Sequence, residues 1–179
     1  MAVVSNNFGV KSRCKHIGNA KMNVEIKPAT IKDAALILDM IIELAEYEKA
    51  RHEVKASVTD IENSLFGENS NTEALICYVD GKPAGYAVFF SSYSTWLGNN
   101  GIYLEDLYVS PDYRGAGAGK KLLKHIAMIA SERKCQRLEW SVLDWNQPAI
   151  DFYKSIGAKP QDEWVRYRMD EQTIAEFIS

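Results

Sequence analysis

The sequence predicts a single mixed α/β domain. Strand-like and helix-like segments alternate along the chain from residue 22 onward, and no repeat or low-complexity linker interrupts them. The 179 residues, 46% of them hydrophobic, are enough for one hydrophobic core. We therefore expect one folded domain over residues 22–179, with residues 1–21 preceding it.

The first elements are a short strand and a capped helix. In residues 23–27, Val24 and Ile26 alternate with polar residues, as in a half-buried strand. Thr30 followed by Asp33 three positions later has the spacing of a capping box at a helix start. The apolar residues after it recur at helical spacing and form the expected buried stripe: Ala34, Ile37, Leu38, Ile41, Ile42 and Ala45.

A second helix and a hairpin follow. A capping box at its start and a glycine at its end predict a helix over residues 57–67. Residues 74–79 and 84–91 are strand-like and flank Asp80-Gly81, a dipeptide that favours a tight hairpin turn. The remaining predicted elements are strands at 102–109, 138–143 and 164–169 and helices at 119–133, 147–155 and 170–177.

Charge is distributed unevenly along the chain. Residues 1–21 carry four basic side chains and no acidic one, whereas the rest of the chain has 17 basic and 24 acidic residues, a net charge of −7. An acidic domain opposes nucleic-acid binding and suits a small cationic substrate. The basic segment shows no helical or alternating period, so we predict a disordered N-terminal extension, with an organellar transit peptide as the alternative.

The cysteines indicate the redox compartment and limit the possible chemistry. Cys14, Cys77 and Cys135 show neither a CxxC pattern nor the Cys/His spacing of metal ligands. This argues against a disulfide framework or a bound metal and indicates a reducing compartment. No apolar run approaches the roughly 20 residues that span a bilayer. We therefore expect a soluble, cytoplasmic protein with no metal and no membrane contact.

Residues 103–121 form a strand followed by an arginine, three glycines at alternate positions and a helix. Small residues at such a junction let backbone N–H groups approach a pyrophosphate. A P-loop is excluded because Arg114 stands where its first glycine belongs and Lys121 where Ser or Thr belongs. The dinucleotide pattern GxGxxG also fails, since no glycine stands three residues after Gly117 or Gly119. The motif that remains is Arg-x-x-Gly-x-Gly.

A second block follows this motif. Residues 145–154 read Trp-Asn-Gln-Pro-Ala-Ile-Asp-Phe-Tyr-Lys, and Gly157-Ala158 come shortly after. With both blocks in order, the chain resembles the GNAT superfamily of acetyl-CoA-dependent N-acetyltransferases over about residues 22–170. The resemblance implies a single GNAT-like domain with a mixed, mostly antiparallel sheet flanked by helices, acetyl-CoA as the acetyl donor, and a homodimer.

Within that superfamily the chain most resembles the spermidine/spermine (diamine) acetyltransferases and the thialysine acetyltransferases. The likeness lies in residues 26–30, 43–48, 103–106, 112–115 and 145–153. Two features depart from the animal polyamine enzymes: Gln147 replaces a Glu, and Leu107-Tyr108 replaces a Phe pair. These departures weaken a polyamine assignment and leave the acetyl-transfer residues intact.

The resemblance also assigns the acetyl-CoA contacts. The backbone amides of Leu107 and Val109 would face the acetyl and pantetheine groups, and the Asn146 side chain would bond the pantetheine arm. The amides of residues 115–120 would hold the pyrophosphate. The complete predicted set is Leu107, Tyr108, Val109, Arg114, Gly115, Ala116, Gly117, Ala118, Gly119, Lys120 and Asn146.

Acetyl transfer needs a neutral amine and a proton for the departing thiolate. A primary ammonium has a pKa of about 10.4, so a base must first remove a proton. Glu105, at the strand end before the glycine loop, is the predicted base, acting directly or through water. Tyr153, whose phenol has an ordinary pKa of about 10, is the predicted general acid, and the resemblance places its hydroxyl near the CoA sulfur. Cys77 lies in an apolar strand and Cys135 has no adjacent base, so direct attack in a ternary complex is expected.

Four residues are predicted to bind the amine. Tyr47 and Glu48 match the family's substrate-contacting Tyr-Glu pair, and with Glu105 and Asp106 they would form an acidic slot for a polycation or aminoalkyl chain. In a regular strand Asp106 faces away from Glu105, but the resemblance implies a bulge that re-aims it. The predicted substrate is a diamine, a polyamine or an aminoalkyl amino acid. A peptide or protein amine is the rival substrate, and a non-catalytic acyl-CoA-binding module is the alternative of a different class.

Overall fold

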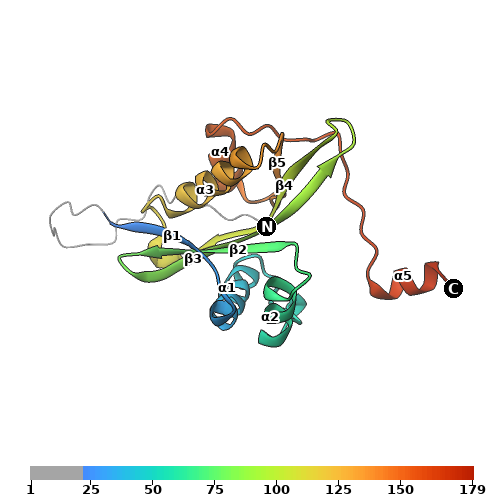
Figure 1. Cartoon of the computed structure of the whole chain (residues 1–179), viewed down its shortest axis with the longest axis horizontal. Coiled ribbons are helices and arrows are strands. Elements are labelled where there is room, and N and C mark those ends of the chain that lie inside the picture. The colour runs from blue at the N-terminus through green and yellow to red at the C-terminus, as the bar shows by residue number, and fades with distance from the viewer. Residues whose placement is uncertain (1–21) are drawn as a thin grey trace.

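The sheet is the centre of the domain. The computed structural model describes residues 22–179, and within them five strands form one sheet in the order β1-β2-β3-β4-β5 (Figure 1). The strands are β1 (Val24–Pro28), β2 (Thr72–Val79), β3 (Lys82–Ser94), β4 (Asn99–Val109) and β5 (Leu138–Trp140). The pairings from β1 to β4 are antiparallel, and β5 runs parallel to β4. The predicted mixed, mostly antiparallel sheet is confirmed, while the predicted extension at residues 1–21 lies outside the described residues.

Helices cover both faces of the sheet (Figure 1). Helices α1 (Ala34–Tyr47) and α2 (Val58–Phe66) pack on one face, and α3 (Ala118–Glu132) and α4 (Gln147–Ser155) pack on the other. The remaining helical elements are short 3₁₀ helices at Ile31–Asp33, Arg51–Glu53 and Pro111–Tyr113 and the terminal helix α5 (Glu171–Phe177).

The predicted caps and hairpin turn are present. The Ser57 N–H donates to Asp60 Oδ2 (2.8 Å), and the Asp60 N–H donates to Ser57 Oγ (3.2 Å). The Thr30 N–H donates to Asp33 Oδ2 (2.7 Å). Between β2 and β3, Asp80-Gly81 adopts the positive φ angles of 49° and 77° that a tight hairpin turn requires.

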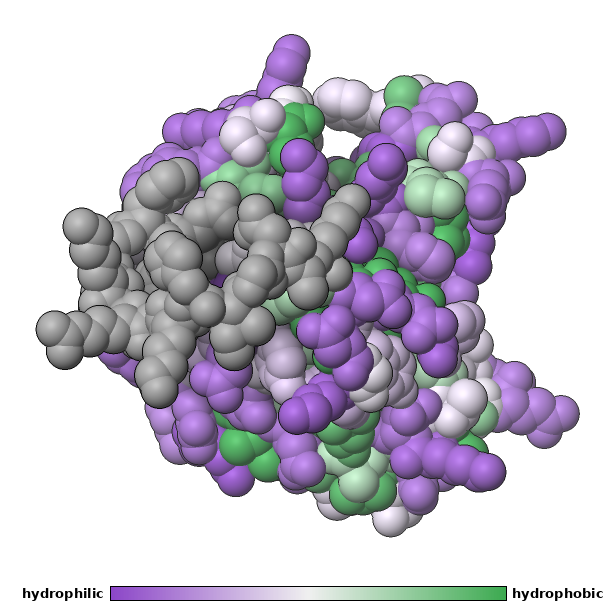
Figure 2. Space-filling view, turned by 90° about the vertical axis from the view of Figure 1, so that its left-hand side faces the viewer, coloured by the Kyte–Doolittle hydropathy of each residue, from purple (hydrophilic) through white to green (hydrophobic). Residues whose placement is uncertain are grey.

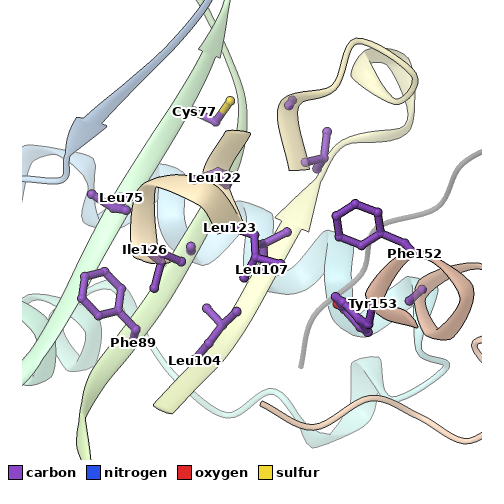
Figure 3. Close-up of a cluster of buried hydrophobic side chains, with 14 of the residues drawn as sticks. Leu75, Cys77, Phe89, Leu104, Leu107, Leu122, Leu123, Ile126, Phe152 and Tyr153 are labelled. Atoms are coloured by element: carbon purple, nitrogen blue, oxygen red, sulfur yellow. The ribbon is translucent and has the colours of Figure 1, made fainter. Parts of the chain in front are cut away.

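Two hydrophobic clusters hold the layers together. Figure 3 shows the first, in which strand residues meet α3 and α4: Leu75, Phe89, Leu104, Leu107, Leu122, Leu123, Ile126, Phe152 and Tyr153. The second cluster lies between the sheet and helices α1 and α2, and it contains the buried rings of Tyr86 and Tyr108. Each face of β4 is therefore covered by a different core.

A β-bulge divides β4 into two parts. Leu104 and Asp106 pair with consecutive residues of β3, so Glu105 between them is an extra residue. The parallel pairing of β4 with β5 also ends at Leu104. Because of the bulge, Leu104 and Leu107 enter the same core although they are three residues apart, and Asp106 lies on the opposite face. The predicted bulge is confirmed.

The prediction of a strand at residues 164–169 is wrong. Residues 159–179 are all exposed and leave the domain as an arm that ends in α5 (Figure 1). The alternation of Val165, Tyr167 and Met169 with polar or aromatic neighbours is strand-like, but a strand needs a neighbour for its backbone hydrogen bonds. None of the strands within residues 22–179 pairs with this segment. The predicted strand at 138–143 is shorter as well, since β5 ends at Trp140.

Candidate active site

The loop after β4 leads the chain into α3. The Ser110 N–H donates to Ala84 O (2.9 Å) and holds the end of β4 against β3. Gly115 (φ +87°) and Gly117 (φ +78°) then adopt the left-handed conformation, which strains any residue with a side chain. A Cβ at either position would meet no atom of residues 22–179 within 4 Å. The alternate glycines are therefore required by backbone conformation, and the space beside them is open to a ligand.

The start of α3 offers backbone donors to an anion. The Lys121 N–H donates to Gly117 O (3.0 Å), so the amides of Ala118, Gly119 and Lys120 precede the first hydrogen bond of the helix. The first turn has no acidic residue, and the positive end of the helix dipole favours a phosphate. The Lys120 side chain is exposed, whereas the Lys121 ammonium approaches a backbone oxygen of β1 (3.5 Å). These features suit the predicted pyrophosphate grip.

The part of β4 beyond the bulge suits the predicted pantetheine contact. The side chains of Leu107, Tyr108 and Val109 are only 0%, 2% and 4% exposed. Strand β5 no longer pairs with β4 at these residues. Only their backbone groups can therefore serve a ligand, which is the role that the sequence predicts for them.

Helix α4 carries the predicted acid and the predicted pantetheine contact. The Asn146 side chain is 2% exposed, and its Oδ1 accepts the Ala149 N–H (3.4 Å) as the helix cap. Tyr153 is 5% exposed, with its ring centroid 5.0 Å from that of Trp140 and 5.5 Å from that of Phe152. Figure 3 shows the rings of Phe152 and Tyr153. Burial raises the pKa of Tyr153, so its hydroxyl remains protonated at neutral pH and is available as a proton donor.

Two half-buried carboxylates gather on the α1 side of β4. The Tyr86 hydroxyl donates to Asp106 Oδ2 (2.9 Å) from the core. Burial raises the pKa of Glu48, which follows α1, and the charge of Asp106 raises it further. Burial and then the charge of Asp106 also raise the pKa of Tyr86, so this phenol stays a donor. The structure thus brings together Glu48 and Asp106 of the predicted slot.

The ring of Tyr47 connects this slot to two other segments. Its centroid lies 5.9 Å from the ring of Trp145, which precedes α4, and 5.0 Å from the guanidinium carbon of Arg114. Tyr47 therefore stands where the end of α1, the glycine loop and the second sequence block meet.

The two carboxylates at the bulge differ in environment. Asp106 is half-buried and bonded to Tyr86, whereas Glu105 is exposed at the point where β4 separates from β5. The predicted slot of four residues is thus divided: Glu48 and Asp106 share one side, and Glu105 stands at the solvent-facing bulge.

Sequence reasoning missed Tyr86, which holds Asp106, and the contacts that the Arg114 and Trp145 side chains make. No motif marks Tyr86. The available signal was its position in a strand with apolar neighbours, because a buried tyrosine hydroxyl requires a partner.

Three further features of the described residues concern a thiol, a metal group and a membrane span. Cys77 is fully buried in the core, and burial raises the pKa of its thiol to about 11, which disfavours the reactive thiolate. Among residues 22–179, no group of three or more His, Cys, Asp or Glu side chains is placed to hold a metal ion. In the same part of the chain, no helix has the length and apolar character needed to cross a membrane.

Comparison with known proteins agrees with this geometry. The chain belongs to the acetyltransferase (GNAT) family, whose profile matches residues 38–158, and this family implies acetyl-CoA as the donor. The chain is an N-acetyltransferase similar to thialysine N-epsilon-acetyltransferase of Sus scrofa, at 40% identity over 166 residues that cover 87% of this chain and 97% of that protein. It also resembles spermidine/spermine N(1)-acetyltransferase-like protein 1 of Homo sapiens, at 31% identity over 86% of this chain and 23% of that protein.

A solved structure shares the fold. An integron cassette protein from the mobile metagenome of V. cholerae superimposes with a TM-score of 0.73 at 31% identity, covering 87% of this chain and 97% of that one. The predicted superfamily and its spermidine/spermine and thialysine branch are confirmed.

Replacing Glu48 tests the electrostatics of the slot. The folded state raises the pKa of Glu48 above its value in the unfolded chain. Protonated Glu48 therefore stabilises the fold at low pH, and this stability is lost as the pH rises through the folded pKa. Glu48→Gln should therefore melt about 1–2 °C above the wild type at pH 7, and the two should converge near pH 4. Thermal denaturation across this pH range measures the difference. Glu46→Gln, an exposed position on the same helix, is the control, and a lower melting temperature of Glu48→Gln at pH 7 contradicts the assignment.

Proposed function

We propose that the chain transfers the acetyl group of acetyl-CoA to a primary amine of a small cation: a diamine, a polyamine or an aminoalkyl amino acid. The observation that carries this substrate class is the presence of two half-buried acids on the α1 side of the sheet: Asp106, bonded to Tyr86, and Glu48, which follows Tyr47 at the end of α1. Partly desolvated carboxylates attract an ammonium group more strongly than exposed ones do. The excess of acidic residues after residue 21 adds a long-range attraction for cations.

The chemistry follows from two groups on different elements. Acetyl-CoA supplies the thioester carbon that the amine nitrogen attacks. Glu105, exposed at the bulge, takes the proton of the ammonium group directly or through water, so that the N–C bond can form. As the C–S bond breaks, Tyr153 donates its hydroxyl proton to the thiolate, a role that suits a phenol kept protonated by burial. The attacking nitrogen then loses its second proton, which restores the phenol, so that the products are the amide and CoA. Attack is direct, in a ternary complex.

Two rivals are retained. A peptide or protein amine is an alternative substrate, and a non-catalytic acyl-CoA-binding module is an alternative function. The small amine is favoured by the pig relative, which is named for thialysine, an aminoalkyl amino acid. The enzyme is favoured over the module because Glu105 and Tyr153 accompany the glycine loop, and binding alone requires neither.

Measuring CoA release separates these possibilities. The purified chain is incubated with acetyl-CoA and, in separate reactions, a diamine, spermidine, thialysine and a lysine-containing peptide. Release of CoA should rise well above hydrolysis with at least one small amine and stay lower with the peptide. Faster CoA release with the peptide would show that the substrate is a peptide or protein amine. No CoA release with any amine would contradict the assignment as an enzyme.

Tyr153→Phe tests the general acid. Loss of the hydroxyl should lower kcat by about 100-fold or more, while the Kd of acetyl-CoA, measured by calorimetry, stays within about threefold. Tyr78→Phe, a half-buried tyrosine on β2, is the matched control and should keep its activity. Full activity of Tyr153→Phe would remove Tyr153 from the mechanism.

We further propose that the chain forms a homodimer through its arm, residues 159–179. Large apolar side chains on the arm are solvent-exposed, including Tyr167 (93%) and Phe177 (77%). Trp164 meets Trp96, in the turn between β3 and β4, at 6.2 Å between ring centroids, so arm and turn form one apolar surface. The opposite end of the domain is mostly hydrophilic where Figure 2 shows described residues. A helix as short as α5 is marginal in water, and a second copy can cover both arms reciprocally.

Removing residues 164–179 tests this assembly. Light scattering should give the full chain twice its monomer mass of 20.2 kDa. The dimer of the truncated chain should dissociate into monomers at concentrations at least about tenfold higher than the full-length dimer does, because the apolar surface of the arm is lost. A full-length monomer, or a truncated dimer of unchanged affinity, contradicts the proposal.

We also infer a reducing compartment such as the cytoplasm for this protein. Cys77 and Cys135 are free thiols, and Cys77 is buried in the core. Free thiols of this kind persist where glutathione and thioredoxin keep cysteines reduced.

A further inference from the structure

Arg114 begins the glycine loop, yet its side chain does not lie along that loop. Its Nε donates to Val109 O (3.0 Å), which closes the turn between the end of β4 and the loop. Its guanidinium carbon lies 5.0 Å from the ring centroid of Tyr47 and 5.8 Å from that of Tyr108. Both rings belong to the hydrophobic cluster on the α1 side of the sheet, whereas α3 packs on the other side. The guanidinium is therefore packed among the residues that border the amine slot.

The contacts of this guanidinium are strong enough to matter. A cation over an aromatic ring is attracted by the negative face of the ring, and this attraction is stronger where water is excluded. One terminal nitrogen of Arg114 is buried without a hydrogen-bond partner in the described chain, so water is largely excluded here. The flat guanidinium stacks on rings while Nε bonds a carbonyl, and lysine cannot reproduce that combination.

The Tyr47 ring links Arg114 to a third segment of the chain. Its ring also contacts Trp145, which directly precedes the buried Asn146 at the start of α4. One row of side chains, Arg114, Tyr47 and Trp145, thus joins the loop predicted to hold acetyl-CoA, the helix end predicted to hold the amine, and the segment predicted to hold the pantetheine arm.

We propose that the Arg114 side chain is a positioning residue for the amine, holding the Tyr47 ring beside Glu48 in register with the glycine loop, while the loop's backbone amides bind the pyrophosphate. This inference rests on the proposed function, since it assigns the amine slot to the end of α1. It differs from a role as phosphate ligand in a measurable way: the two roles place the loss of affinity on different substrates.

Four variants test the inference: Arg114→Lys, Tyr47→Leu, the double variant, and Arg51→Lys as a control at an exposed arginine soon after α1. Calorimetry gives the Kd of CoA alone and of the reactive amine in the presence of CoA, a pair that binds without turnover. Steady-state kinetics give the two KM values and kcat for the single variants.

A positioning role predicts that the substitutions weaken amine binding and leave CoA binding nearly unchanged. Arg114→Lys should raise the KM and Kd of the amine about fivefold to tenfold and change the Kd of CoA by less than about threefold. Tyr47→Leu should do the same, and the double variant should be little worse than either single one, because both remove one shared contact. Arg51→Lys should match the wild type. If Arg114→Lys unfolds, Tyr47→Leu alone carries the test of weakened amine binding with unchanged CoA binding.

Other outcomes overturn the inference. A loss of CoA affinity of about tenfold or more with unchanged amine binding would make Arg114 a phosphate ligand. Additive effects of the two substitutions would show that the contact is not shared. If the wild type acetylates the amine and Arg114→Lys binds and acetylates it equally well, only this inference is refuted. If the wild type neither binds nor acetylates an amine, the proposed function is refuted and the inference with it.

Discussion

The bulge at Glu105 is the constraint on which the site depends. One extra residue in β4 ends the regular register with β3 and coincides with the last residue that pairs with β5. It also lets Leu104 and Leu107 fill one core while Asp106 reaches the buried hydroxyl of Tyr86 on the other face. Without it, strict alternation would rotate the following residues to the wrong faces. The donor side and the amine side of the site are separated by this single insertion.

The proposed amine slot sets stability against binding. Burial disfavours the ionised form of Glu48, and the nearby Asp106 adds repulsion. A cationic amine relieves both costs when it binds, because it supplies the missing countercharge. In the proposed function, binding strength would be gained from a local destabilisation of the unliganded domain, which the two hydrophobic cores offset elsewhere.

Local signals in the sequence predict most of the fold. The capping boxes at Thr30 and Ser57 and the Asp80-Gly81 turn act within a few residues, and each appears where the sequence predicts it. The segment at residues 164–169 shows the limit of such signals, because a strand pattern does not specify which partner will pair with it. The same holds in the site: the glycine loop is a local motif, whereas the contact of Arg114 with Tyr47 joins residues far apart in the sequence.

Leu107, Tyr108 and Val109 bury their side chains and leave only main-chain atoms along the open edge of β4. A main chain presents the same amides whatever side chains it carries. Substitution at these positions is therefore limited by the volume of the core and not by the chemistry of the donor. The proposed amine slot, in contrast, depends on side chains such as Glu48. Substitutions in the proposed amine slot could therefore change which amine is accepted while leaving the recognition of acetyl-CoA unchanged.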